Sequence, residues 1–155
     1  MMSLNDLADQ TQGPTSKTDL AEAADTSKAI YLGNEAILVE HKNKKNLFDP
    51  FFQSGFNTYQ LVPLAIRQSL FKGEPPYHNI DAIFISHAHG DHFAATDLVR
   101  FLTAFPGTKV IAPSQAIDQI KALSRSKQVS TNLIAIDRFG VSRPTAYALI
   151  AANHV

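Results

Sequence analysis

The chain has 155 residues, which is enough for one domain with a substantial core, and its 45% hydrophobic content excludes a disordered composition. Lys plus Arg and Asp plus Glu number 14 each, so the net charge gives no reason to expect a nucleic acid or a membrane as partner. The chain has no cysteine, which excludes disulfides, thiol catalysis and Cys-ligated metals. Any bound metal must be held by nitrogen and oxygen.

Residues 1–28 are rich in Asp, Thr, Ser, Ala and Gln and show no sustained apolar period. We therefore expect a poorly ordered leader over 1–28, followed by a single domain over 29–155. The start lacks the basic and apolar regions of a signal peptide, and no apolar stretch is long enough to span a membrane. These features predict a cytoplasmic protein, with a periplasmic location open only if the N-terminus is altered.

The first ordered elements predicted along the chain are short strands. Residues 29–32 and 36–40 are apolar runs separated by the turn signal Gly33-Asn34-Glu35, and 47–49 forms a third strand after a polar turn over 41–46. Three such strands predict an antiparallel meander. An amphipathic helix entered near Pro63 and ending at Gly73 follows.

From Ile80 onward strands and helices alternate. The pattern predicts strands over 81–86, 109–112 and 133–137, a helix over 96–105, and a second helix for which Ser114 is the N-cap. Strands that alternate with helices require crossover connections. The predicted fold class is therefore α/β.

Four metal-ligand side chains lie within the segment His87-Ala88-His89-Gly90-Asp91-His92, directly after a buried strand. His87 and His89 are expected to point the same way and to hold one ion, because alternate side chains of an extended segment share a face. Asp91 and His92 follow in a turn that Gly90 permits, and are expected to face a neighbouring ion position. Nitrogen and oxygen ligands suit Zn²⁺ first, with Mn²⁺ or Fe²⁺ as alternatives. Two such ions can share and activate a bridging water.

This segment resembles the His-x-His-x-Asp-His signature of the metallo-β-lactamase superfamily. The runs Tyr31–Val39 and Leu47–Phe52 resemble the opening hairpins of the same family. The resemblance implies an αββα sandwich, with His87 and His89 on one metal and Asp91 and His92 on a second. It implies a hydrolase in which a metal-bound hydroxide attacks a carbonyl or phosphoryl centre of a small-molecule substrate, while Asp91 orients that hydroxide or takes up its proton. The resemblance also places Asp49 at the end of a strand, close to the metal site.

The chain departs from the family pattern in its second half. The family adds a further His, a bridging Asp and a final His after the signature, whereas this chain ends at Val155. We therefore expect the N-terminal half of the fold, with residues after about Phe139 loosely packed. His154 is the sole candidate for a third ligand to the first metal, and we expect it to stay away from the site. Two alternatives stay open, an inactive fragment and a metal-binding module that forms a homo-oligomer through its uncovered sheet face.

Several other residues have two readings. Asp49 is either a turn residue at a strand end or a partner that fixes a metal-bound imidazole. His41 and His78 lie in polar loops and are expected to be solvated or structural, and Ser86 lacks the surroundings of a serine nucleophile. A set of aromatic residues is expected to pack in the core, with a substrate entrance as the alternative. Its members are Phe48, Phe51, Phe52, Phe56 and Tyr59.

Overall fold

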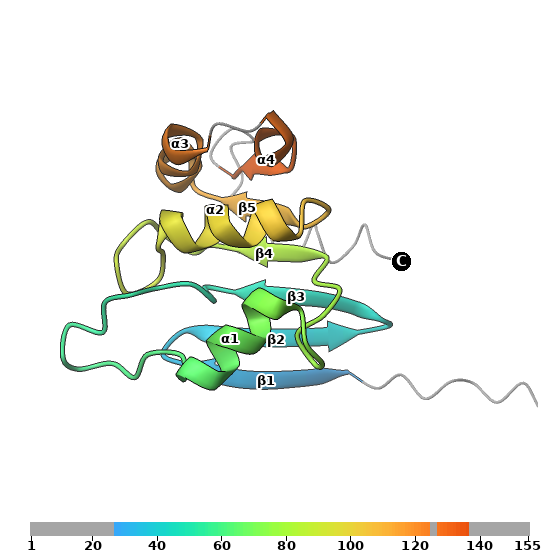
Figure 1. Ribbon diagram of the computed structural model, residues 1–155. Coiled ribbons are helices and arrows are strands. Elements are labelled where there is room, and N and C mark those ends of the chain that lie inside the picture. Colours follow the sequence, from blue (N-terminus) through green and yellow to red (C-terminus); the bar gives the residue numbers. More distant parts are fainter. Residues whose placement is uncertain (1–26, 125–126, 137–155) are drawn as a thin grey trace, which may run out of the picture.

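Six strands form one mixed sheet in the order β1-β2-β3-β4-β5-β6, and Figure 1 shows it with helices lying against it. This architecture is seen in a computed structural model that describes residues 27–124 and 127–136. The predicted α/β class is confirmed. The elements are, in order, β1 (Lys28–Gly33), β2 (Ala36–His41), β3 (Lys44–Phe48), α1 (Leu64–Lys72), β4 (Ala82–Phe84), α2 (Ala95–Ala104), β5 (Lys109–Ala112), α3 (Ser114–Leu123), α4 (Lys127–Thr131) and β6 (Leu133–Ala135).

Strands β1, β2 and β3 form the predicted antiparallel meander. The two hairpin turns contain Asn34 and Asn43, whose φ angles of 41° and 63° are left-handed, a conformation that asparagine tolerates well. The prediction of a polar turn over 41–46 was wrong in extent, because β3 already begins at Lys44. The sequence did not predict Lys45 as a strand residue, because a charged side chain is unusual at a buried position. Its ammonium group donates a hydrogen bond to the carbonyl of Pro76.

The second half of the sheet is parallel. β3, β4, β5 and β6 run in the same direction, and each connection between neighbours contains a helix. The short helix α4 was not predicted, and β4 and β6 are three residues long, shorter than expected. Ser114 is the first residue of α3 and not its N-cap, because Pro113 occupies that position without a side-chain cap.

The main core lies between the sheet and the helices. The fully buried side chains of Ile83, Leu98 and Ile120 come from β4, α2 and α3 and belong to one hydrophobic cluster. Alternate residues of the strands, such as Phe84 and Ile111, belong to a second and smaller cluster. The helices therefore cover one face of the sheet (Figure 1), as the amphipathic patterns predict.

Helix α1 ends in a Schellman motif at Gly73, where the sequence predicted its end. The Gly73 amide donates to the Leu70 carbonyl at 3.2 Å, and the Glu74 amide donates to the Ser69 carbonyl at 3.0 Å. The Ser69 hydroxyl also donates to the Glu74 carboxylate, and this bond lowers the pKa of Glu74 below its ordinary value, with partial desolvation opposing the shift and Lys72 adding to it. The motif fixes the direction in which the chain leaves the helix.

Replacing Gly73 with alanine is expected to destabilise the protein by about 1–2 kcal/mol, because Gly73 has a left-handed φ of 64°. A Cβ at this position would also lie 2.9 Å from Cε1 of Phe105. Urea denaturation measures the change. Gly107→Ala is the matched control, since a Cβ there meets nothing within 4 Å, and an equal loss in both variants would contradict the prediction.

Some expectations concern residues outside the described part of the chain. The leader over 1–28 lies there except for its last two residues, and β1 begins at Lys28, one residue before the predicted start. The tail after Phe139 and His154 also lie outside the described residues. Among the residues that are described, no helix is both long and apolar enough to cross a membrane.

Candidate metal centre

The candidate site lies at the edge of the sheet where β3 and β4 end. These strands are parallel, with Phe48 paired to Phe84, so the residues that follow them emerge side by side. Asp49 follows β3, and its amide donates to the Phe84 carbonyl at 2.9 Å. Ser86 and His87 follow β4 after one further buried residue. The order of the strands therefore brings together groups that are about 40 positions apart in the sequence.

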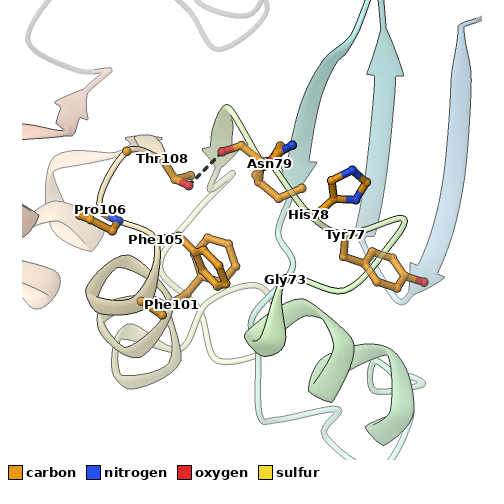
Figure 2. A pocket seen from close by; sticks show the side chains of 11 residues that line it. Gly73, Tyr77, His78, Asn79, Phe101, Phe105, Pro106 and Thr108 are labelled. Atoms are coloured by element: carbon orange, nitrogen blue, oxygen red, sulfur yellow. Dashed lines mark hydrogen bonds between the residues drawn. The ribbon is translucent and has the colours of Figure 1, made fainter.

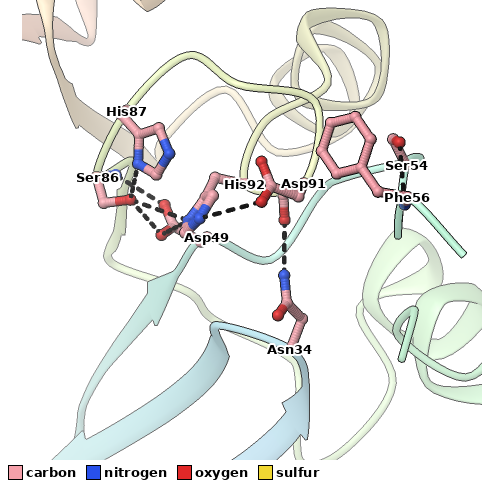
Figure 3. A network of polar contacts seen from close by, with 8 residues as sticks. All are labelled: Asn34, Asp49, Ser54, Phe56, Ser86, His87, Asp91 and His92. Carbon is pink, nitrogen blue, oxygen red and sulfur yellow. Dashed lines mark hydrogen bonds and ion pairs between the residues drawn. The ribbon is translucent and has the colours of Figure 1, made fainter. Parts of the chain in front are cut away.

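Asp49 is the centre of the hydrogen-bond network shown in Figure 3. Its side chain is 7% exposed, and one carboxylate oxygen accepts the Ser86 amide at 2.7 Å. The other accepts the Ser86 hydroxyl at 2.6 Å and lies 2.9 Å from Nδ1 of His92. Asp49 also has a left-handed φ of 41° at the end of its strand. Both readings of Asp49 thus apply, as a strand-end residue and as a partner of a candidate ligand.

The network sets the proton positions on two imidazoles. An ionised carboxylate only accepts hydrogen bonds, so Nδ1 of His92 must donate to Asp49. The Ser86 hydroxyl donates its hydrogen to Asp49. Its oxygen is therefore the acceptor for Nδ1 of His87, which lies 3.0 Å away. Protonation at Nδ1 leaves Nε2 of His92 with the lone pair that metals bind. The sequence did not predict that Ser86 would hold these imidazoles, because the only feature that marked Ser86 was its position directly before the motif.

Three of the four predicted ligands converge. Ligand atoms of His87, Asp91 and His92 all lie within 4.8 Å of one another, and Nε2 of His92 is 3.7 Å from an Asp91 carboxylate oxygen. His89 is exposed and is not part of this set, although its ring is perpendicular to that of His87 with centroids 4.6 Å apart. The expected assignment of His87 and His89 to one ion, and of Asp91 and His92 to a second, stays a prediction.

The motif turn is held by contacts from distant segments. The Ser54 amide donates to the Gly90 carbonyl at 3.1 Å, and the side-chain amide of Asn34 donates to the Asp91 carbonyl at 3.0 Å. The His89 carbonyl accepts the amides of His92 and Phe93. Three successive carbonyl groups are therefore occupied, each by a different part of the chain. The sequence indicated a turn at Asn34 but gave no sign of this contact.

A buried polar group supports the helix that follows the motif. Asp97 in the first turn of α2 is 6% exposed and accepts hydrogen bonds from Gln53 and Arg67. These bonds join α1, α2 and the loop after β3. An acidic residue in the first turn of a helix is also favoured by the helix dipole. The segment that leads away from His92 is thus fixed at its far end.

The aromatic residues divide into two groups. Phe51 and Phe52 are buried and Phe48 is half-buried and stacked on Phe84, as the core reading predicted. Phe56 and Tyr59 are 62% and 50% exposed, so the core reading was wrong for these two. They lie in the loop after β3, which is tied to the motif through Ser54, and Figure 3 shows Phe56 beside Ser54.

A cavity of about 340 Å³ lies at the opposite edge of the sheet (Figure 2). Its walls come from the segments that precede β4 and β5 and from the end of α2, including His78, Phe101 and Phe105. His78 is half-buried, and its Nδ1 is 3.5 Å from the Lys45 ammonium. His41 is exposed and pairs with the Ser27 hydroxyl. Neither histidine faces the motif, in agreement with their expected structural or solvated roles.

Residues 32–115 match a model of the metallo-beta-lactamase superfamily. This match covers more than half of the chain and includes the first hairpin turn, the second hairpin, the motif and the first two crossovers. This chain belongs to the metallo-β-lactamase superfamily. The mixed sheet with helices, and a His-Asp-His cluster at the end of β4, are consistent with a fragment of that fold.

One solved structure to which this chain is similar is a protein from Parabacteroides distasonis that is provisionally described as a metal-dependent hydrolase. The two share 16% sequence identity and a TM-score of 0.39, over 62% of this chain. The chain spans 40% of the length of that structure. A search of the curated proteins finds no significant match.

The donor set fits a divalent metal. Two imidazoles and one carboxylate are one of the common sets of three protein ligands in catalytic zinc sites. At bond lengths of about 2.0–2.2 Å, two ligand atoms of a tetrahedral zinc ion lie about 3.4 Å apart. The 3.7 Å between Nε2 of His92 and the Asp91 carboxylate is close to this separation, and the ligand atom of His87 lies within 4.8 Å of the other two. The Asp49–His92 pair is the carboxylate–histidine arrangement that commonly supports a ligating imidazole.

Proposed function

We propose that this protein is a zinc-dependent hydrolase in which His87, His89, Asp91 and His92 hold one or two ions, with a coordination position left open for water. The observation that carries the proposal is the convergence of three ligand atoms within 4.8 Å on a scaffold that fixes the Nδ1 protons. Functional sites need side chains that are fixed by supporting hydrogen bonds, whereas a purely structural turn does not. Mn²⁺ and Fe²⁺ are the alternatives that the same donors accept.

A bound divalent ion lowers the pKa of water and polarises a carbonyl or phosphoryl oxygen. In the proposal, residues of this chain orient the attacking water, accept its proton and hold the ligands in place. Asp91 is the candidate base, because a carboxylate beside the ion can orient the attacking water and take up its proton. Asp49 and Ser86 hold the imidazoles in the ligating tautomer and keep His92 aimed at Asp91.

The proposed substrate is a small molecule with an electrophilic carbonyl or phosphoryl group. The balanced charge of the chain favours neither nucleic acid nor a membrane surface as substrate. The exposed rings of Phe56 and Tyr59 lie in the loop that Ser54 ties to Gly90 of the motif, and they offer apolar contact to a substrate. The remaining specificity depends on loops, which vary widely among proteins of one fold.

The experiment that tests the proposal measures zinc binding and zinc-dependent hydrolysis in the same preparations. We expect the purified chain to bind zinc, and His87→Ala and His92→Ala each to weaken binding at least tenfold, since each removes one of few ligands. Competition with a chromophoric chelator gives the affinity. Hydrolysis of a chromogenic ester, a chromogenic lactam and a chromogenic phosphodiester, with and without chelator, gives the activity.

His41→Ala is the matched control, because His41 is an exposed histidine on β2 outside the cluster. It should leave zinc binding unchanged. Equal loss in all three variants, or no binding by the unaltered chain, would overturn the metal site. Zinc binding without turnover of any of these substrates would overturn hydrolysis by this chain and favour the inactive fragment or the metal-binding module instead.

A further inference from the structure

We propose that Asn34 is a positioning residue for the metal centre, acting through Asp91; this inference rests on the proposed zinc site. Asn34 lies in the turn between β1 and β2, and its side-chain amide donates to the main-chain carbonyl of Asp91 at 3.0 Å (Figure 3). The two residues are 57 positions apart. Asn34 contacts no candidate ligand atom in this bond, so its effect on an ion passes through the backbone of Asp91.

The turn that carries Asp91 depends on such external contacts. It is a tight turn that includes a glycine, and within it the amides of His92 and Phe93 donate to the His89 carbonyl. The next carbonyl, of Gly90, is held by the Ser54 amide, and the Asp91 carbonyl is held by Asn34. The Asp91 carbonyl belongs to the peptide that joins Asp91 to His92, and the amide of the same peptide donates to the His89 carbonyl. Without the Asn34 bond this peptide is held at its amide alone, so it can tilt and shift the Asp91 carboxylate relative to His92.

The chemistry of the position favours asparagine. The acceptor is a carbonyl, so the partner must present an N–H or O–H donor, and aspartate would present an acceptor instead. The backbone of Asn34 has a φ of 41°, which asparagine adopts more readily than most residues with a side chain. One residue thus satisfies both the hairpin turn and the contact to the motif.

Asn34→Gly separates these two roles, because glycine accepts the left-handed φ but has no amide to donate. Asn43→Gly is the matched control: Asn43 has a φ of 63° in the other hairpin turn, at the opposite end of β2. Zinc affinity is measured by chelator competition. In the metal-free proteins, amide hydrogen exchange is followed at Ser54, His92 and Phe93, the donors to the motif turn.

We expect Asn34→Gly to weaken zinc binding about tenfold, the lower end of the effect of losing a partner behind a ligand. We expect the three amides to exchange about fivefold faster, the factor that corresponds to one ordinary hydrogen bond. Asn43→Gly should change neither quantity. Unchanged affinity and exchange in Asn34→Gly, or equal changes in both variants, would overturn the inference.

The two proposals fail in different ways. If the unaltered chain binds no zinc, the proposed function is wrong, and the exchange measurement still decides whether Asn34 holds the Asp91 turn. If the unaltered chain binds zinc and Asn34→Gly binds it equally well, the metal centre stands and the positioning role of Asn34 is refuted.

Discussion

Asp49→Asn is expected to weaken zinc binding ten- to hundredfold and to destabilise the metal-free protein by about 2–3 kcal/mol. The buried carboxylate accepts three hydrogen bonds, from the Ser86 amide, the Ser86 hydroxyl and His92. An asparagine of the same shape replaces one acceptor oxygen with an NH₂ donor, which then faces another donor. The result is at least one buried polar group without a partner, and an imidazole whose tautomer is no longer fixed.

The measurement combines chelator competition for zinc with urea denaturation of the metal-free chain. Asp118→Asn is the matched control, because Asp118 is exposed on α3 and outside the network. It should alter stability by less than about 0.5 kcal/mol and leave zinc affinity unchanged. If Asp49→Asn keeps wild-type zinc affinity while losing stability, Asp49 is a purely structural strand-end residue.

Phe101→Ala is expected to be the most destabilising substitution in the core, at about 3–5 kcal/mol. Phe101 is 1% exposed on α2, and its ring lies 5.2 Å from that of Phe51 and 4.7 Å from that of Phe105, measured between centroids. Removing the ring leaves a cavity that α2 cannot close, because its first turn is fixed by the bonds to Asp97.

Urea denaturation at constant temperature measures this loss. Phe56→Ala makes the same chemical change at a residue that is 62% exposed, and should cost less than about 0.5 kcal/mol. Similar losses in the two variants would show that burial does not determine the effect, and would contradict the described packing of the core.

The sequence predicted those parts of the fold where local and global preferences agree. β5 and the end of α1 at Gly73 appear at the predicted residues, since apolar period and helix-stop signals coincide there. The prediction failed where a tertiary contact compensates an unfavourable residue. The sequence around Lys45 is typical of a loop. Its burial is explained by the Pro76 carbonyl, which the fold brings within hydrogen-bond distance of its ammonium group.

The candidate site divides in the same way. The three converging ligands, His87, Asp91 and His92, lie within one six-residue segment, so their types and spacing were sufficient to find them. Their supports come from other segments: Asn34 from the first hairpin and Asp49 from the end of β3. An asparagine in a turn is common in any fold, so Asn34 carries no signal until strand pairing brings it to the motif. The family resemblance drew attention to Asp49, but its sequence context could not decide between a turn residue and a partner of a ligand.

This separation of ligands from supports has a thermodynamic consequence for unfolding. A ligand stabilises a protein according to the difference between its affinities for the folded and the unfolded chain. Because the four candidate ligands lie within a six-residue segment, the unfolded chain keeps them close together and retains some affinity for zinc. The gain in stability on adding zinc should therefore fall below the value calculated from the affinity of the folded state alone. The shortfall measures how much of that affinity the segment has by itself, and the remainder is what the distant supports add.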